Sequence, residues 1–143
     1  MDFNKKKEAD FYKAKTNGIE VRVKPEYVIG HSSSNIEKED VFIWAYHVRI
    51  ENKSDKTFQI ISRYWKIIDE KGGVQEVNGD GVIGEQPILT PGSNFHYSSS
   101  VNLSYPSGIM LGHYVMRKED DQAIEIKIPT FSLDIPNIQS VVN

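Results

Sequence analysis

The chain has 143 residues, a length typical of one domain, and 38% of them are hydrophobic while 26% are charged, as in an ordinary soluble globular protein. Its formal net charge of -3 excludes a general electrostatic attraction to nucleic acid or to an anionic membrane, so neither is an expected partner. The chain contains no cysteine, which excludes disulfide bonds, thiol catalysis and cysteine-ligated metal centres.

The chain opens with a polar N-terminal segment. Its first residues, MDFNKKKEAD, carry charges with no apolar stretch behind them, so they do not resemble a secretory signal. The longest apolar run in the chain, VFIWAY at 41–46, is far too short to cross a bilayer. We therefore expect a cytoplasmic protein.

Alternation of apolar and polar residues, the pattern of a strand with one buried face, follows and recurs along the chain. It runs from 19 to 24 and, after a polar loop at 31–40, from 41 to 50. A third long strand is predicted at 57–69. In the second run the predicted core face consists of Phe42, Trp44, Tyr46, Val48 and Ile50.

Further strand-like segments follow, each bounded by turn residues. They are expected at 74–77, 94–103, 109–118 and 124–128. Seven or eight strands at short spacing, with no credible helix, predict an all-β chain built of two packed antiparallel sheets or a barrel. The residues expected in or beside the core include Trp44, Tyr46, Trp65, Tyr97, Ile126 and Ile128.

Residues 79–84, GDGVIG, have the G-x-G-x-x-G spacing of a dinucleotide-binding loop. That motif requires a helix directly after it, but Pro87 and Pro91 oppose a helix at this point, and no carboxylate lies about 20 residues on, where a ribose partner belongs. We therefore predict a glycine-rich turn that needs positive φ angles. The alternative that stays open is an anion-binding nest built on Gly79, Gly81 and Gly84.

Arg63 is the most informative charged residue. Lys66 must reach water, because an unpaired buried ammonium group is very costly. Trp65 and Ile67 then point inward, and strict alternation also turns Ile61 and Arg63 inward. An inward guanidinium needs carbonyl or carboxylate acceptors, so Arg63 is predicted to tie a loop near the glycine segment to the sandwich. The alternative is that it binds a ligand there.

No catalytic or metal-binding set is recognisable. His96 and His113, expected on neighbouring strands that turn near Pro106, fall on opposite faces, so we expect no metal site between them. The serines at 98–100 lack the G-x-S-x-G elbow of a nucleophile and are typical of an exposed strand edge. The acidic turn at 119–121 is typical of solvated charge. We expect no cofactor, no metal and no enzymatic activity.

Several blocks of the sequence closely resemble the ApaG family. They include SRYW at 62–65, VNGDGVIGEQP at 77–87, PSGIM at 106–110 and IPTF at 128–131, in the same order. The resemblance implies an immunoglobulin-like, fibronectin type III-like antiparallel β-sandwich. One departure is Tyr64, where the family often has His.

The resemblance also implies a division of the chain and a setting for its function. The ApaG-like domain covers 18–134, between an N-terminal segment at 1–17 and a C-terminal tail at 135–143. Bacterial members of the family are linked to cobalt and magnesium tolerance or efflux. The same domain occurs in eukaryotic F-box proteins and in a polymerase-interacting protein, where a protein-binding role is supposed.

Three functions are compatible with these features. The preferred one is a non-catalytic module that recognises a protein partner. The second is a protein that binds a phosphorylated ligand or a divalent cation where the glycine segment meets Arg63. The third is an enzyme acting on phosphoanhydrides, which would need clustered carboxylates and a metal. A homodimer formed through edge strands is possible as well.

Overall fold

The computed structural model describes residues 11–29 and 41–135, and these contain strands and no helix. The predicted polar loop at 31–40 and the opening ten residues lie outside the described residues. None of the described segments is a helix long and apolar enough to span a membrane. The strands are β1 (Tyr12–Thr16), β2 (Ile19–Ile29), β3 (Phe42–Asn52), β4 (Phe58–Asp69), β5 (Val74–Asp80), β6 (Ile88–Leu89), β7 (Asn94–Leu103), β8 (Ser107–Lys118) and β9 (Ala123–Asp134).

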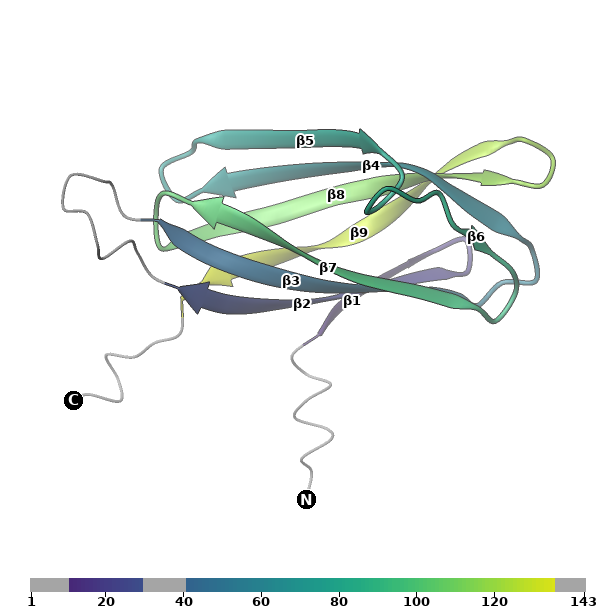
Figure 1. Cartoon of the computed structure of the whole chain (residues 1–143), viewed down its shortest axis with the longest axis horizontal. Coiled ribbons are helices and arrows are strands. Elements are labelled where there is room, and N and C mark those ends of the chain that lie inside the picture. The colour runs from purple at the N-terminus through teal and green to yellow at the C-terminus, as the bar shows by residue number, and fades with distance from the viewer. Residues whose placement is uncertain (1–10, 30–40, 136–143) are drawn as a thin grey trace, which may run out of the picture.

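The strands form two antiparallel sheets that pack face to face, as Figure 1 shows. One sheet has the strand order β1-β2-β3-β7, and the other has the order β5-β4-β8-β9. The short strand β6 pairs with the beginning of β4. The chain passes from one sheet to the other between β3 and β4, between β6 and β7, and between β7 and β8. The predicted all-β antiparallel sandwich is confirmed.

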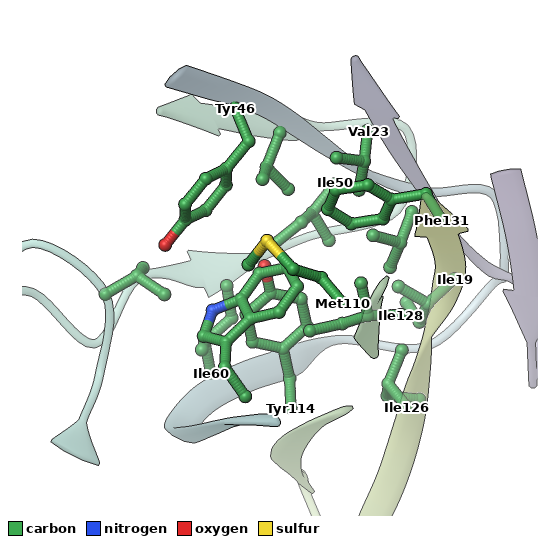
Figure 2. Close-up of a cluster of buried hydrophobic side chains, with 14 of the residues drawn as sticks. Ile19, Val23, Tyr46, Ile50, Ile60, Met110, Tyr114, Ile126, Ile128 and Phe131 are labelled. Carbon is green, nitrogen blue, oxygen red and sulfur yellow. The ribbon is translucent and has the colours of Figure 1, made fainter. Parts of the chain in front are cut away.

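Side chains from both sheets fill the space between them, because alternate residues of each strand point inward. Figure 2 shows Tyr46 from β3, Met110 from β8 and Phe131 from β9 in this layer. The predicted core residues are confirmed: Trp44, Tyr46, Trp65, Ile126 and Ile128 are buried, and Tyr97 packs against them half-buried.

The expectation that His96 and His113 lie on neighbouring strands is wrong. Their strands, β7 and β8, belong to different sheets, because the chain crosses the sandwich at 104–106 instead of turning back as a hairpin. The side chains of the two histidines therefore lie on the outer faces of opposite sheets.

The strict alternation predicted for β4 is also wrong in its first half. A bulge between Ile60 and Ser62 shifts the register with β8, so Ile60 is fully buried and Ile61 is only half-buried. From Arg63 to Ile67 the predicted alternation holds. The strand β1, within the predicted polar segment, was not anticipated.

The two long sides of the sandwich differ. On one side β1 contacts β9, and the rings of Tyr12 and Phe131 lie 5.7 Å apart. On the other side β5 and β7 are the outermost strands of their sheets. There Gln75 Nε2 donates a hydrogen bond across the gap to the carbonyl oxygen of Asn102, at 3.2 Å. The sandwich is thus closed by β1 and β9 and more open between β5 and β7.

Candidate functional site

The glycine segment ends in a tight turn, and no helix follows it. The two central residues of the turn, Ile83 and Gly84, both have positive φ angles, of 47° and 73°. The backbone of Val82 and Glu85 on either side exchanges two hydrogen bonds, of 2.8 and 3.0 Å. This is the geometry of a two-residue hairpin turn, which the twist of paired strands favours. The prediction of a turn in place of a dinucleotide loop is confirmed.

The other two glycines of the motif allow close approaches. A Cβ at Gly81 would collide with the carbonyl oxygen of Glu85, and its φ of 63° also disfavours a side chain. A Cβ at Gly79 would lie 2.7 Å from Nη1 of Arg63, because the guanidinium packs directly over this residue. The glycine spacing is therefore explained by packing within the chain.

Arg63 connects β4 to the glycine segment, as predicted. The side chain is half-buried, and Nη1 donates hydrogen bonds to the carbonyl oxygens of Asp80 (3.1 Å) and Gly81 (2.9 Å). The N–H of Gly81 donates in turn to the carbonyl oxygen of Ile61 at 2.7 Å. The structure thus brings Arg63 together with Gly79 and Gly81, while Gly84 lies in the turn beyond. These groups form hydrogen bonds with one another within the chain. Their role in binding a ligand stays a prediction.

Two tyrosine hydroxyl groups lie between the sheets, close to Arg63. Tyr97 from β7 and Tyr114 from β8 form a hydrogen bond of 2.5 Å between their hydroxyl oxygens, which links the two sheets. Burial raises the pKa of both hydroxyls well above the ordinary value, while the nearby charge of Arg63 acts in the opposite direction. Both hydroxyls therefore stay protonated at neutral pH, and the pair is a structural tie.

A serine, a histidine and a carboxylate line up across the four-stranded sheet. His47 Nδ1 lies 2.7 Å from Ser98 Oγ, and His47 Nε2 lies 2.8 Å from Glu26 Oε1. The His47 and Glu26 side chains are 41% and 62% exposed, so water screens their interaction. Activation of a serine also requires donors for the developing oxyanion, which a flat sheet face does not provide. We interpret this row as cross-strand hydrogen bonding.

The outer face of the five-stranded sheet carries a row of apolar side chains. Val74, Ile68 and Ile109 are directly opposite one another on β5, β4 and β8. Val74 is 54% exposed and Ile109 is 43% exposed. Scattered apolar residues are normal on a surface, but three in register form a contiguous patch. We call this set the apolar row.

A pocket of about 430 Å³ lies beside the apolar row on the same face. It forms where a bulge interrupts the pairing of β8 with β9 next to Gly112. A Cβ at Gly112 would collide with the carbonyl oxygen of Tyr64, so glycine permits the close approach of β8 to β4 here. Leu111 lines it with apolar surface, and the buried Ile128 lies at its base. The polar side chains that line it are Tyr64, His113, Glu125, Lys127 and Thr130.

Polar contacts connect all four strands across this pocket. The hydroxyl of Tyr64 donates to Glu76 at 2.6 Å, and this hydrogen bond raises the pKa of Tyr64. The Tyr64 ring stacks on His113 at 5.1 Å, and His113 Nδ1 lies 2.9 Å from Glu125 Oε2. Sequence reasoning missed this arrangement, although Tyr64 was noted as the departure from the family pattern.

No metal site is formed by the residues that the structure describes. They contain no group of three histidines, aspartates or glutamates placed to hold an ion. His113 has one carboxylate neighbour, Glu125, and His96 lies on the other sheet.

Comparison with known proteins agrees with the motifs. Residues 32–118 match the ApaG domain. The chain is 46% identical to Protein ApaG of Mesorhizobium japonicum and 48% identical to Protein ApaG of Brucella suis, in each case over 92% of this chain and 99% of the relative. The crystal structure of the putative ApaA protein from Bordetella pertussis superposes with a TM-score of 0.74 at 38% identity, covering 87% of this chain and 98% of the other. A match of this extent, together with the shared fold, shows that the chain belongs to the ApaG family.

Proposed function

We propose that this chain is a non-catalytic module that binds a protein partner through the outer face of its five-stranded sheet. The observation that carries the proposal is the apolar row of Val74, Ile68 and Ile109 beside the pocket at Gly112. Protein interfaces commonly have a desolvated apolar centre, a pocket that accepts an anchoring side chain and a polar rim. This face has all three.

The rim consists of groups suited to hydrogen bonding with a partner. Glu125 and Lys127 are exposed at the pocket, and Tyr64 and His113 form its aromatic wall. Aromatic residues are enriched at the centres of interfaces because they bury a large area at a small entropic cost. An apolar or aromatic side chain of the partner would enter the pocket, while polar groups around it pair with the rim.

The alternative functions have less support from the geometry. A phosphorylated ligand or a divalent cation at the glycine segment would have to compete with the carbonyl groups that Arg63 already binds. An enzyme acting on phosphoanhydrides would need clustered carboxylates and a metal. We therefore propose that the chain is not an enzyme.

The family supplies a setting for this proposal. We place the protein in the cytoplasm, acting on a partner connected with cobalt and magnesium tolerance, as the family link implies. The resemblance implies an immunoglobulin-like sandwich, a fold that hosts many functions, so the site rather than the fold supports the proposal.

The test is a titration of the natural partner against a matched pair of variants. A stoichiometric partner is first purified from the native cytoplasm on the parent chain and then titrated calorimetrically against Ile109→Ser and Ile88→Ser. Ile88 lies in β6, outside the apolar row, and is 63% exposed. We expect Ile109→Ser to weaken binding about tenfold, as loss of a central contact does. Ile88→Ser should leave the affinity unchanged.

Two results would contradict the proposal. One is an equal effect of the two variants, which would place the interface elsewhere. The other is that the chain catalyses a reaction on a small molecule with no protein bound.

A further inference from the structure

The strand β5 has an unprotected edge. It pairs with β4 on one side, and no described strand pairs with it on the other. Proteins commonly shield such edges with proline, lysine or a bulge. The sequence of β5, VQEVNGD, has no proline and no lysine, and its register with β4 is regular. All of its residues except Gly79 are exposed. In Figure 1 β5 forms the outer margin of the molecule.

The hydrogen-bond pattern identifies the backbone groups at this edge. In an antiparallel pair, alternate residues bond to the neighbouring strand and those between them turn to the free side. The N–H of Asp69 donates to Gly73 and that of Gly81 donates to Ile61, so the odd-numbered residues of β5 bond to β4. The residues that present both an N–H and a C=O group to the free side are therefore Val74, Glu76 and Asn78.

A slot between the two sheets opens beside this edge. It has a volume of about 270 Å³ and lies between β5 and β7. Gln75 and Val77 of β5 line one wall, and residues 100–102 of β7 line the other. The slot reaches the core side chains of Tyr46, Trp65 and Met110. A strand added to β5 would therefore direct alternate side chains into a slot with an apolar floor and a partly polar rim, and the others along the apolar row.

The charge of β5 specifies the complementary strand. Glu76 and Asp80 are exposed, and neither forms an ion pair with a cation among the described residues. We infer that β5 binds an extended segment of a protein partner by strand addition, with apolar residues facing the slot and a basic residue opposite Glu76. Strand addition combines main-chain hydrogen bonds with pockets for alternate side chains. The inference rests on the proposed protein-binding function and gives its mode of recognition.

A second copy of this chain fits the edge less well. Two antiparallel copies of β5 centred on Val77 would set Val74 opposite Asp80, which places an apolar residue against a charge. No cation from either β5 strand would balance the carboxylates of Glu76 and Asp80. A segment with both basic and apolar residues can place an apolar residue opposite Val74 and a cation opposite Glu76.

The experiment uses a synthetic peptide with the chain alone, so it does not depend on the natural partner. The probe is acetyl-Lys-Val-Thr-Val-Lys-Val-Val-amide, whose second lysine lies opposite Glu76 in antiparallel register. Nuclear magnetic resonance follows the backbone amides of Val74, Glu76 and Asn78 during titration. We expect saturable binding with a Kd below about 1 mM and the largest shifts at these three amides. The same peptide N-methylated at threonine and at the second lysine should not bind.

A charge exchange provides the matched control. We expect Glu76→Lys to weaken binding of the lysine peptide about three- to tenfold, and to favour a peptide with glutamate in place of both lysines. Glu119→Lys, which changes an exposed carboxylate in the turn between β8 and β9, should have no effect.

Three outcomes would overturn the inference. The first is no binding, and the second is binding that is insensitive to N-methylation and to Glu76→Lys. The third is a concentration-dependent dimer that is lost in Glu76→Lys, because the edge would then be occupied by a second copy. None of these outcomes affects the Ile109→Ser test of the proposed function, which uses the natural partner.

Discussion

At the scale of single residues, the glycine segment and Arg63 depend on each other. Arg63 and Gly79 are directly opposite on β4 and β5, and the guanidinium occupies the space that a side chain at Gly79 would fill. Two backbone carbonyl groups accept hydrogen bonds from the guanidinium of Arg63. A motif with the spacing of a phosphate-binding loop is thus explained by one arginine and the turn that it supports.

This dependence predicts coupled losses of stability. Arg63→Ala should lower the free energy of unfolding by about 1–2 kcal/mol, since the two carbonyl groups lose a charged donor and the site is only half-buried. Arg63→Lys should also destabilise, because an ammonium group cannot reproduce the planar guanidinium. Gly79→Ala should displace the guanidinium, so the double variant should lose less than the sum of the single losses.

Urea unfolding of the four variants would measure this coupling. Arg117→Ala is the control, because Arg117 is exposed, and it should change stability by no more than about 0.5 kcal/mol. If the double variant loses as much stability as the sum of Arg63→Ala and Gly79→Ala, the contact between Arg63 and Gly79 does not couple the two positions.

Gly84 and Gly81 should also differ in their tolerance of substitution. Gly84→Ala meets no atom within 4 Å and should cost only the strain of a positive φ, about 1–2 kcal/mol. Gly81→Ala has the same strain and collides with the backbone at Glu85, so it should cost clearly more. Denaturant melts would rank the two variants.

The turn interpretation also predicts that the glycine segment does not bind nucleotides. Calorimetry with ATP or NAD should show no binding with a Kd below about 1 mM. A micromolar constant that is lost in Gly84→Val would contradict the turn interpretation.

At the scale of strands, local patterns were predictable and pairings were not. The alternation of Trp44, Tyr46 and Val48 is a property of one segment, so the buried face of β3 could be predicted. The bulge at Ile60 and the crossing between β7 and β8 depend on contacts between segments far apart in the sequence. For the same reason the inward position of Arg63 was predictable, whereas the stacking of Tyr64 on His113 was not.

A buried carboxylate on β2 also lies beside two cations, one two residues along the same strand and one just after the end of β3. Glu20 Oε1 lies 3.2 Å from Arg22 Nε and 3.0 Å from Lys53 Nζ, and the Glu20 side chain is almost fully buried. Burial by itself would raise the pKa of Glu20, but the hydrogen bond from Lys53 and the charge of Arg22 outweigh it and lower the pKa below 4.5. The pKa of Glu20 is lower in the folded than in the unfolded state. The ionised carboxylate therefore stabilises the fold at every pH above the unfolded-state pKa. This stabilisation is lost as the pH falls through the folded-state pKa.

Stability should therefore decrease on acidification from about pH 5, and Glu20→Gln should reduce that decrease. At pH 7 the same variant should be less stable than the parent by about 1–3 kcal/mol, because two cations lose their acceptor. Denaturant melts between pH 7 and pH 3 would show both effects. Glu119→Gln, at an exposed turn, should lose as much stability between pH 7 and pH 3 as the parent does. If Glu20→Gln also loses as much stability as the parent over this range, this role for the Glu20 carboxylate is excluded.

At the scale of the whole molecule, the two long sides of the sandwich differ in how their strand edges are covered. Where β1 meets β9 the edges cover each other, and where β5 and β7 diverge a backbone edge and a slot reach the surface. The family and the sandwich could be recognised from the sequence, since ordered motifs and strand periodicity are local. The candidate face could not, because Val74, Ile68 and Ile109 come from three segments that only the folded sheet brings into register.

The proposed connection with cobalt and magnesium tolerance leads to a final prediction. The described residues offer a metal only pairs of ligands, such as His113 with Glu125 and His47 with Glu26, and His96 lies on the opposite sheet from His113. Cobalt or magnesium at about 1 mM should therefore leave the melting temperature unchanged within about 1 °C. A metal present at 100 times its Kd would add about 2.7 kcal/mol, which corresponds to a rise of roughly 5–10 °C for a chain of this size. A rise of that magnitude with cobalt, absent in His113→Ala and kept in His96→Ala, would establish a metal site at the pocket and make the ion part of the proposed recognition surface.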